Sequence, residues 1–134
     1  MGMRGGRTVM VESSRFAKPW RESVLTQSHE QYKGSPLTGP LSVNITFWLA
    51  RPKNHYRMVD KELSNIIKAN APIFSTSGTQ GDIDKIARCT LDGLQSPCGG
   101  CVIQSDALVV SLQCEKRYVT ELEGSGATIH VIQR

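Results

Sequence analysis

The sequence predicts a two-layer α+β domain, in which a small mixed or antiparallel sheet carries two main helices on one face. Residues Leu41–Leu49 alternate apolar and polar side chains, the period-two pattern of a strand with one buried face. Two further segments, 19–32 and 82–94, repeat apolar residues at helical spacing. The elements do not alternate in a regular β-α-β rhythm, which favours the α+β class.

Size and composition indicate one folded domain. The chain has 134 residues, of which 39% are hydrophobic and 21% charged, and this excludes a disordered chain. We therefore expect a single domain over residues 1–134. No run approaches the roughly 20 apolar residues of a membrane span, and the N-terminus has no apolar signal core. We expect a cytoplasmic protein with no membrane partner.

The first half of the chain contains a predicted strand and a predicted helix ahead of the strand already described. Residues Thr8–Val11 form a short apolar run typical of a strand. A helix is expected over 19–32, because Pro19 suits a first helical turn. Gly34–Pro40 is typical of a loop, and Arg51–Arg57 is a polar, basic segment.

The second half contains a predicted helix and two predicted strand regions. We expect a loop or short helix between Val59 and Lys68, and a helix that begins near Asp82. Val102–Glu115 is expected to form one long strand or a strand pair, and Thr128–Ile132 a final short strand. The expected buried residues are Ile83, Ile86, Ala87, Leu91 and Leu94 on the helix, with Leu108, Val110, Leu112 and Cys114 sharing one strand face.

Asp82 and Asp84 are a candidate metal-binding pair. Residues two apart on a continuous helix point to nearly opposite sides. If Asp82 is the N-cap, however, its backbone is extended and its side chain can turn toward Asp84. Carboxylates so close favour a bound cation. The alternative is a helix cap followed by a solvated acid, since the helix dipole favours negative charge there.

Asp106 is the third candidate ligand. It precedes the apolar run Ala107–Val110, where a strand end can bring a carboxylate to the start of the helix. Three carboxylates form an oxygen-only set that suits Mg²⁺, with Mn²⁺ as a substitute. The three histidines are scattered along the chain and show no metal-ligand spacing.

Four cysteines leave two further interpretations open. They are expected to be reduced in a cytoplasmic protein. Cys98-Gly-Gly-Cys101 has the spacing of half a zinc site, and Cys89 and Cys114 or a partner subunit would have to complete it. A redox pair normally precedes a helix, whereas Pro97 and the glycines are typical of a turn.

Basic residues gather at the N-terminus. The formal net charge is +4, and the first 21 residues contain five basic side chains and one acid. A basic arm over residues 1–18 is a plausible phosphate-contacting surface, although it is also typical of a solvated chain end.

The order of several short motifs resembles the RusA family of Holliday junction resolvases. These motifs are Arg51-Pro52-Lys53-x-His55-Tyr56, Asp82-x-Asp84-Lys85, Leu91-Asp92-x-Leu94 and Asp106-x-x-Val109-Val110, with Pro19-Trp20-Arg21 upstream. The resemblance covers residues 8 to 134. Each motif is weak alone, but their order and spacing are specific.

The resemblance implies a homodimer that resolves Holliday junctions by paired symmetric nicks, in DNA recombination and repair in a bacterial or phage-infected cell. It implies that Asp82, Asp84 and Asp106 bind the catalytic metal, and that Arg88, with Lys85 adjacent, assists catalysis. Hydrolysis would then leave a 5′-phosphate and a 3′-hydroxyl. The expected contacts to branched DNA are Arg7, Arg15, Lys18, Arg21, Arg51, Lys53, His55, Arg57, Lys116 and Arg117.

Two departures from the family pattern support an alternative. Gly81 stands where the family usually has proline, and Ser105 stands where it often has an additional acid. A junction-binding protein with weakened nuclease activity is therefore the second hypothesis. A zinc-stabilised interaction module built on Cys98 and Cys101 is the third.

Overall fold

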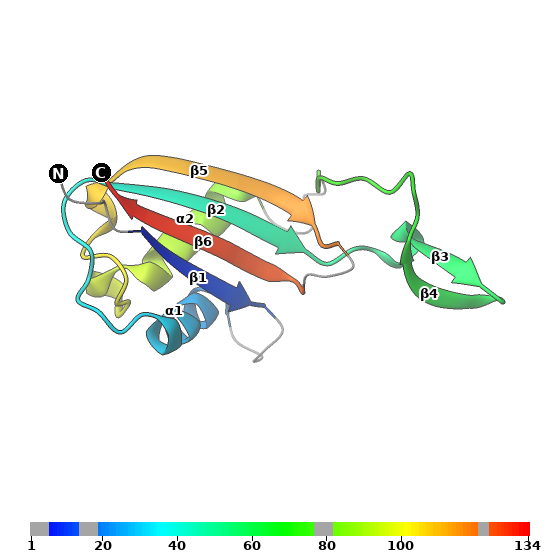
Figure 1. The fold of residues 1–134 in the computed structure, drawn as a ribbon, viewed down its shortest axis with the longest axis horizontal. Coiled ribbons are helices and arrows are strands. Elements are labelled where there is room, and N and C mark those ends of the chain that lie inside the picture. The colour runs from blue at the N-terminus through cyan, green and yellow to red at the C-terminus, as the bar shows by residue number, and fades with distance from the viewer. Residues whose placement is uncertain (1–5, 14–18, 77–81, 121–123) are drawn as a thin grey trace.

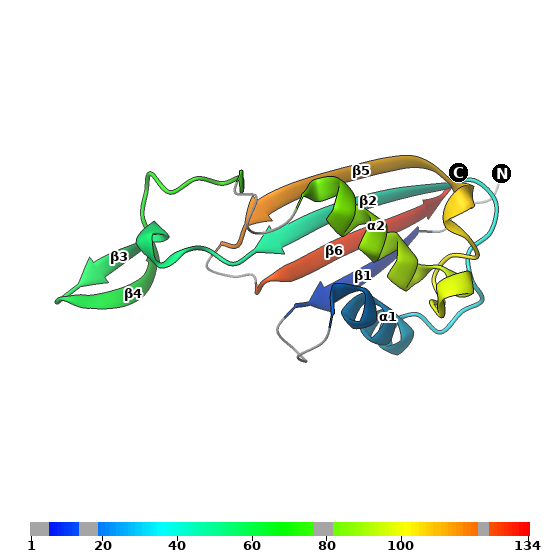
Figure 2. The same cartoon turned by 180° about the vertical axis from the view of Figure 1, so that it is seen from behind.

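A computed structural model describes residues 6–13, 19–76, 82–120 and 124–134. Figures 1 and 2 show the molecule from two opposite sides. The helices and strands are, in chain order, β1 (Gly6–Glu12), α1 (Trp20–Gln31), β2 (Leu41–Leu49), β3 (Tyr56–Val59), β4 (Glu62–Ile67), α2 (Ile83–Leu94), β5 (Val109–Tyr118) and β6 (Gly126–Gln133).

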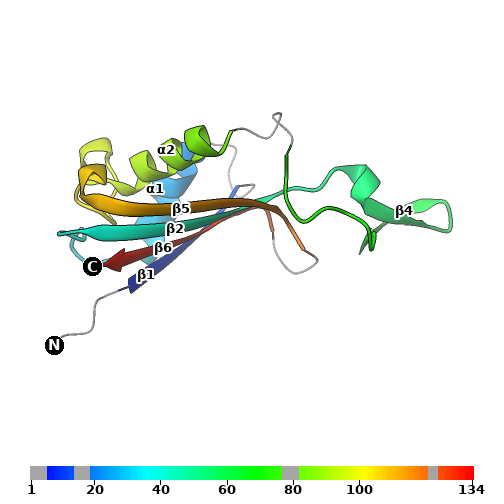
Figure 3. The same cartoon turned by 90° about the horizontal axis from the view of Figure 1, so that it is seen from above.

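The main sheet is mixed and has the strand order β1-β6-β2-β5. Strand β2 runs parallel to β5 and antiparallel to β6, and β6 is antiparallel to β1. Both helices cover the same face of this sheet (Figure 3). The two-layer α+β architecture predicted from the sequence is therefore confirmed. None of the helices in the described part of the chain is long and apolar enough to cross a membrane.

The core lies between the sheet and the two helices. Strand β2 follows the predicted alternation, with Leu41, Val43, Ile45 and Phe47 all buried. The neighbouring strands add Val9, Val11, Ile129 and Val131, and the helices add Val24 and Leu94. Because β2 is an inner strand with helices over one face, its alternating pattern gives a strong signal.

Helices α1 and α2 cross at Gly93, and this close contact fixes where α2 lies on the sheet. A Cβ atom at Gly93 would lie 2.7 Å from Cβ of Val24 and 2.8 Å from the backbone oxygen of Arg21. Nearby, the indole N–H of Trp20 donates to Oγ1 of Thr90 across 2.9 Å. Only glycine lets the two helix backbones approach so closely at this position.

The outer edge of β1 is covered by two glutamines of α1. The side-chain amide of Gln27 donates to the backbone oxygen of Glu12 and accepts from its N–H, both at 2.8 Å. Gln31 makes the same pair of bonds to Met10, at 2.6 and 2.9 Å. Gln27 and Gln31 lie one helical turn apart, and this spacing matches that of Met10 and Glu12 on the strand. The backbone N–H and C=O groups of Met10 and Glu12 are therefore hydrogen-bonded without another strand.

Strands β3 and β4 form a separate two-stranded sheet that projects beyond the main sheet (Figures 1 and 3). We call residues 53–68, which include this hairpin and its root, the β3–β4 arm. The tight turn at its tip places Asp60 and Lys61 at φ values of 52° and 64°. The expectation of a loop or short helix between Val59 and Lys68 is therefore wrong, because this segment turns back and pairs with β3.

Two predictions of burial also need correction. Ile83 is 37% exposed, because it lies in the first turn of α2, whereas Thr90 and Gly93 are buried. Val110 and Leu112 are 64% and 43% exposed. The pairing of β5 with β2 shifts register beside Val110, and β5 has a described strand on one side only.

Candidate active site

The predicted carboxylate pair lies at the start of α2. Asp82 is the N-cap, with extended backbone at φ −79° and ψ 142°, and Asp84 lies in the first turn. Among the residues that the structure describes, the Asp82 side chain makes no capping hydrogen bond. It is 63% exposed, and its Oδ2 atom lies 3.8 Å from Nζ of Lys85. The N-cap position is therefore confirmed, but the carboxylate is not used to close the helix end.

Asp106 lies at the other end of α2. Its backbone N–H donates to Oε1 of Gln95, the residue that caps the C-terminus of that helix. Helix α2 is twelve residues long, so its two ends are about 18 Å apart at 1.5 Å per residue. The strand–helix–strand connection explains this separation, since α2 runs back along the sheet before β5 begins (Figure 2).

One copy of the chain does not bring the three aspartates together. Among the described residues, no group of three or more histidine, cysteine, aspartate or glutamate side chains could hold a metal ion. Asp82, Asp84 and Asp106 are all exposed. The start of α2 thus offers two of the three expected carboxylates to solvent, and the third lies on a separate surface.

The other residues of the α2 motif have distinct surroundings. Arg88 is exposed and lies one turn after Asp84, on the same helix as Lys85. Asp92 is half-buried and accepts a hydrogen bond from Nε2 of Gln95 across 3.1 Å. Asp92 therefore helps to fix the Gln95 side chain, which in turn holds the backbone of Asp106.

Arg51 and His55 join the root of the β3–β4 arm to the main sheet. The Arg51 side chain donates to the backbone oxygens of Val119 and Pro72, at 2.6 and 2.7 Å, and its Nη1 atom lies 3.3 Å from Nδ1 of His55. His55 packs edge-on against the ring of Tyr118, with the two centroids 4.8 Å apart. Burial, with Arg51 and Lys68 nearby, lowers the pKa of His55.

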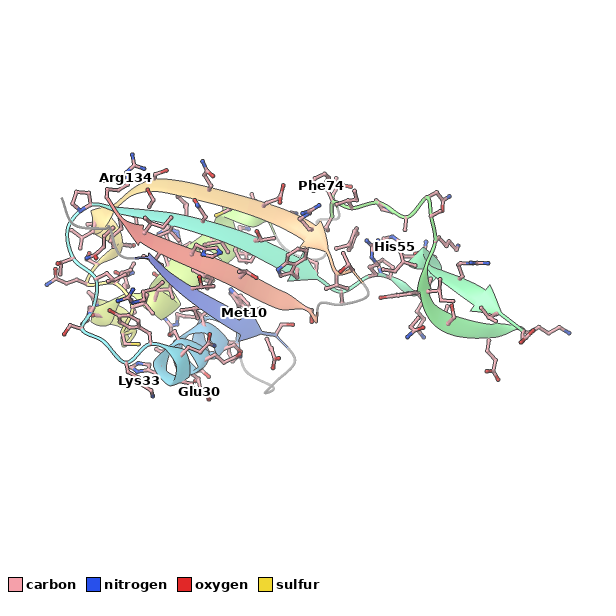
Figure 4. The ribbon with its side chains drawn as sticks, in the orientation of Figure 1. Met10, Glu30, Lys33, His55, Phe74 and Arg134 are labelled. Atoms are coloured by element: carbon pink, nitrogen blue, oxygen red, sulfur yellow. The ribbon has the colours of Figure 1, made fainter. Side chains whose placement is uncertain are left out.

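Arg117 packs against two aromatic rings. Its guanidinium carbon lies 5.8 Å from the ring centre of Trp48 and 5.5 Å from that of Phe74. Nε of Arg117 is buried and has no hydrogen-bond partner in the described part of the chain, and Oε2 of Glu115 lies 3.8 Å from it. Phe74 is 50% exposed and lies beyond the end of β5 (Figure 4). This arrangement holds a cation beside exposed aromatic surface.

The remaining expected DNA contacts are spread over several surfaces. Arg7 lies on β1, where its guanidinium carbon is 5.9 Å from the ring centre of Tyr32. Arg21 is exposed on α1, Lys53 and Arg57 are exposed on the β3–β4 arm, and Lys116 is half-buried on β5. Arg15 and Lys18 lie outside the described residues, as does Gly81.

The cysteine segment forms a turn. Ser96–Cys98 is a short 3-10 helix, and Gly99 follows with φ 98°. A Cβ atom at Gly100 would lie 2.4 Å from the backbone carbon of Leu94, so the chain passes close to the end of α2. All four cysteines are free, and burial raises the pKa of the Cys101 and Cys114 thiols. The interpretation as a glycine-rich turn is supported.

Sequence reasoning missed the aromatic residues beside the basic ones. Trp48, Phe74 and Tyr118 belong to none of the candidate motifs in the sequence. The contact between these residues can be recognised only in the folded chain, because Trp48 and Arg117 are paired residues on the neighbouring strands β2 and β5. A cavity of about 630 Å³ lined by Met10, Trp48 and neighbouring residues lies away from all three aspartates.

Within the β2–α2–β5 unit, the start of α2 presents two carboxylates to solvent, and carboxylates are the ligands that hold the divalent ions of metal-dependent nucleases. The family model for endodeoxyribonuclease RusA matches residues 2–131. The chain therefore belongs to the RusA family of endodeoxyribonucleases, enzymes that act on branched, crossover-junction DNA and depend on divalent metals. No curated protein and no solved structure matches the chain.

Proposed function

We propose that this protein is a Mg²⁺-dependent resolvase that cuts four-way DNA junctions by paired symmetric nicks and acts as a homodimer. In this proposal, each metal site uses Asp82 and Asp84 of one subunit together with the partner's Asp106. Lys85 and Arg88 of the first subunit stabilise charge on the scissile phosphate. The observation that carries the proposal is the exposed pair of carboxylates at the start of α2, with a third carboxylate at its far end.

The residues present fit a divalent metal. Asp82 makes no capping bond and Asp84 is exposed, so neither carboxylate is committed to holding the fold. Carboxylate oxygens are the ligands that Mg²⁺ prefers, and none of the three residues brings a sulfur or nitrogen donor. When bound, the metal would activate water and neutralise developing charge on the phosphate.

A second subunit is part of the proposal for a geometric reason. Asp106 is held to the C-terminal end of α2 by Gln95, about 18 Å from the start of the helix. A metal ligand must lie about 2 Å from the ion, so Asp106 cannot complete its own chain's pair without a rearrangement of α2. A two-fold axis solves this problem, because it exchanges the two ends between subunits and creates two equal sites. Two such sites match the two opposed strands of a junction.

The lysine and arginine of α2 have separate expected roles. Lys85 lies 3.8 Å from Asp82, where it offsets the repulsion between the carboxylates before a metal binds. Arg88 lies one turn further along the helix. Its planar guanidinium suits bidentate contact with phosphate oxygens. A phosphate beside Asp82 and Asp84 would then be flanked by cations from the same helix.

A complementation experiment tests the shared site. Asp82→Asn and Asp106→Asn subunits are expressed separately and together, with different affinity tags so that mixed dimers can be purified. A mixed dimer has one site with both substitutions and one intact site. We expect each variant alone to be inactive and the mixed dimer to make single nicks in a four-way junction with Mg²⁺. An inactive mixed dimer, beside an active parent, would contradict the shared site.

The parent protein tests the activity itself. A mobile four-way junction is incubated with Mg²⁺, with Mn²⁺ and with a chelator. We expect paired nicks that a ligase can reseal in either metal, and binding without cleavage in the chelator. Binding without cleavage under all three conditions would instead support a junction-binding protein with weakened nuclease activity.

A further inference from the structure

We propose that the β3–β4 arm binds the branch point of the DNA, and that its exposed apolar side chains contact base faces left open where stacking is interrupted. This inference rests on the proposed function and adds to it the element that distinguishes a branch from a linear duplex. The described residues support it by the position of the arm, its surface chemistry and the way its root is held.

The arm contributes little to the folded core. Within the described residues, its two strands pair with each other and not with the main sheet. Met58, Val59, Leu63 and Ile66 are 60%, 43%, 46% and 42% exposed. Met58 and Leu63 are cross-strand partners and share one face of the hairpin, whereas Val59 pairs with Glu62 on the other. An isolated hairpin is marginally stable in water, and exposed apolar surface of this kind in soluble proteins usually marks an interaction site. A partner that covers these side chains is therefore expected.

The charge of the arm favours a polyanion as that partner. Residues 53–68 contain four basic side chains and two acidic ones. Lys53, Arg57 and Lys61 are all exposed, and Asp60 and Lys61 share the tip. A two-stranded ribbon of this kind fits a DNA groove, and apolar side chains on such elements insert at base steps. At a branch the stack is already interrupted, so contact with a base face avoids part of the unstacking cost.

Hydrogen bonds hold the root of the arm in place. Arg51 bonds to Val119 and Pro72, and the backbone N–H of Lys68 donates to the backbone oxygen of His55 across 2.9 Å. The Arg51 bonds connect the segment that enters the arm after β2 with the segments that follow β5 and β4. The Lys68–His55 bond closes the base of the arm, and His55 (labelled in Figure 4) packs against Tyr118 at the end of β5. A fixed root lowers the entropy lost when the arm meets DNA.

The β3–β4 arm leaves the main sheet at the end nearer the carboxylates of α2. It follows the C-terminal end of β2, and α2 begins on the side of the sheet nearer the arm (Figures 1 and 3). Asp82 and Asp84 lie at that start. DNA held at those carboxylates therefore has the β3–β4 arm beside it, at the position that the branch point would occupy.

Excision of the arm gives the first test. Tyr56 and Ile67 are cross-strand partners, so residues 57–66 can be replaced by an Asn-Gly turn that keeps the root. We expect unchanged thermal stability, unchanged oligomeric state by light scattering, and similar affinity for linear duplex. Affinity for a four-way junction without divalent metal should fall about tenfold or more, as for the loss of a stacked base contact.

Single substitutions separate the apolar contact from the charge. Met58→Ser should lower the preference for junction over duplex and leave the salt dependence of binding unchanged. Met10→Ser is the matched control, because Met10 is 61% exposed on β1, away from the arm. Arg57→Gln should reduce the slope of log affinity against log salt by about 0.9 if it neutralises one phosphate.

The outcomes separate this inference from the proposed function. An arm-deleted protein that retains the parent's preference for junctions overturns the inference and leaves the proposed function intact. An arm-deleted protein that becomes monomeric also overturns it, because the arm would then contact the second subunit. A parent protein that neither binds nor cuts junctions overturns the proposed function, and this result is seen before any arm variant is made.

Discussion

Oε1 of Gln95 accepts a hydrogen bond from the backbone N–H of Asp106 across 3.2 Å, and Gln95 is the residue at which helix α2 ends. This bond places the third predicted carboxylate at the opposite end of α2 from Asp82. One copy of the chain, as described, therefore does not bring Asp106 to the carboxylates at the start of α2.

Asp82→Asn, Asp84→Asn and Asp106→Asn should each abolish cleavage and retain junction binding. Each change removes a charged metal ligand but leaves a side chain of the same size. In metal-free buffer the variants should bind DNA at least as tightly as the parent, because a negative charge near phosphate is lost. Cleavage and gel-shift assays on one junction measure both effects.

Asp92→Asn is the control for that series. Asp92 lies on α2 as well, but it accepts a bond from Gln95 that an asparagine oxygen can also accept. It should keep most of the activity. An Asp82→Asn protein that cuts at the parent rate would show that Asp82 is not a metal ligand.

Gln27→Met should lower the free energy of unfolding by about 1–3 kcal/mol, the cost of leaving buried polar groups unpaired. Gln27 is 1% exposed and bonds to both backbone groups of Glu12. Gln31→Met removes an equivalent pair of bonds at an exposed position, where water can replace them, so its effect should be smaller. Urea denaturation compares the two variants, and equal losses would contradict this account.

Gly93→Ala should destabilise the protein by about 1–3 kcal/mol through overpacking. The added methyl group would meet Val24 and the backbone of Arg21 within 3 Å, which outweighs the better helix propensity of alanine. Gly124→Ala is the control, because a Cβ atom there meets nothing within 4 Å. Thermal unfolding of both variants checks the prediction, and a stabilised Gly93→Ala protein would refute it.

His55 should make the protein less stable in mild acid. Its pKa is lowered from the ordinary value of 6.5 by burial, Arg51 and Lys68. The unfolded chain therefore takes up this proton at a higher pH than the folded protein does. The contribution is fully present above pH 6.5 and is lost as the pH falls through the lowered pKa. Unfolding at a series of pH values should show a shallower dependence for His55→Gln than for the parent.

The cysteines should differ in their rates of alkylation. Cys89 and Cys98 are exposed, whereas burial raises the pKa of Cys101 and Cys114. The thiolate is the reactive form, so the exposed pair should react first with iodoacetamide near pH 8. Peptide mass spectrometry over time resolves the four sites. Zinc retained by the purified protein, and lost with Cys98→Ser, would instead support the zinc module.

The parts of the fold predicted correctly are those in which neighbouring residues of the sequence already show which side of the element is buried. Leu41–Leu49 matches the observed strand, since it is an inner strand with one face on the helices. The start of α2 at Asp82 was also predicted, because an N-cap aspartate precedes a periodic run. Both signals come from neighbours in the sequence.

The parts predicted incorrectly depend on distant partners. Glu62–Ile67 has no clean alternation, because neither face of β4 packs on a core, and Asp60-Lys61 is not a typical hairpin turn. Sequence spacing likewise gave no information on the 18 Å or so between Asp82 and Asp106, which follows from the path of α2 along the sheet. The aromatic contacts of Arg117 arise between neighbouring strands and a loop, so no linear motif contains them.

The two glutamines on β1 also limit how copies of this protein can add to one another. Gln27 and Gln31 occupy the backbone groups of Glu12 and Met10, which an incoming strand would need at the C-terminal end of that edge. In the described part of the chain, β5 has a strand partner on one side only. Two copies that join through β5 would consume both open edges and leave a glutamine-covered strand on each outside. Strand addition at this end of β1 would then first have to displace two glutamine side chains, which disfavours growth of the sheet into a fibre.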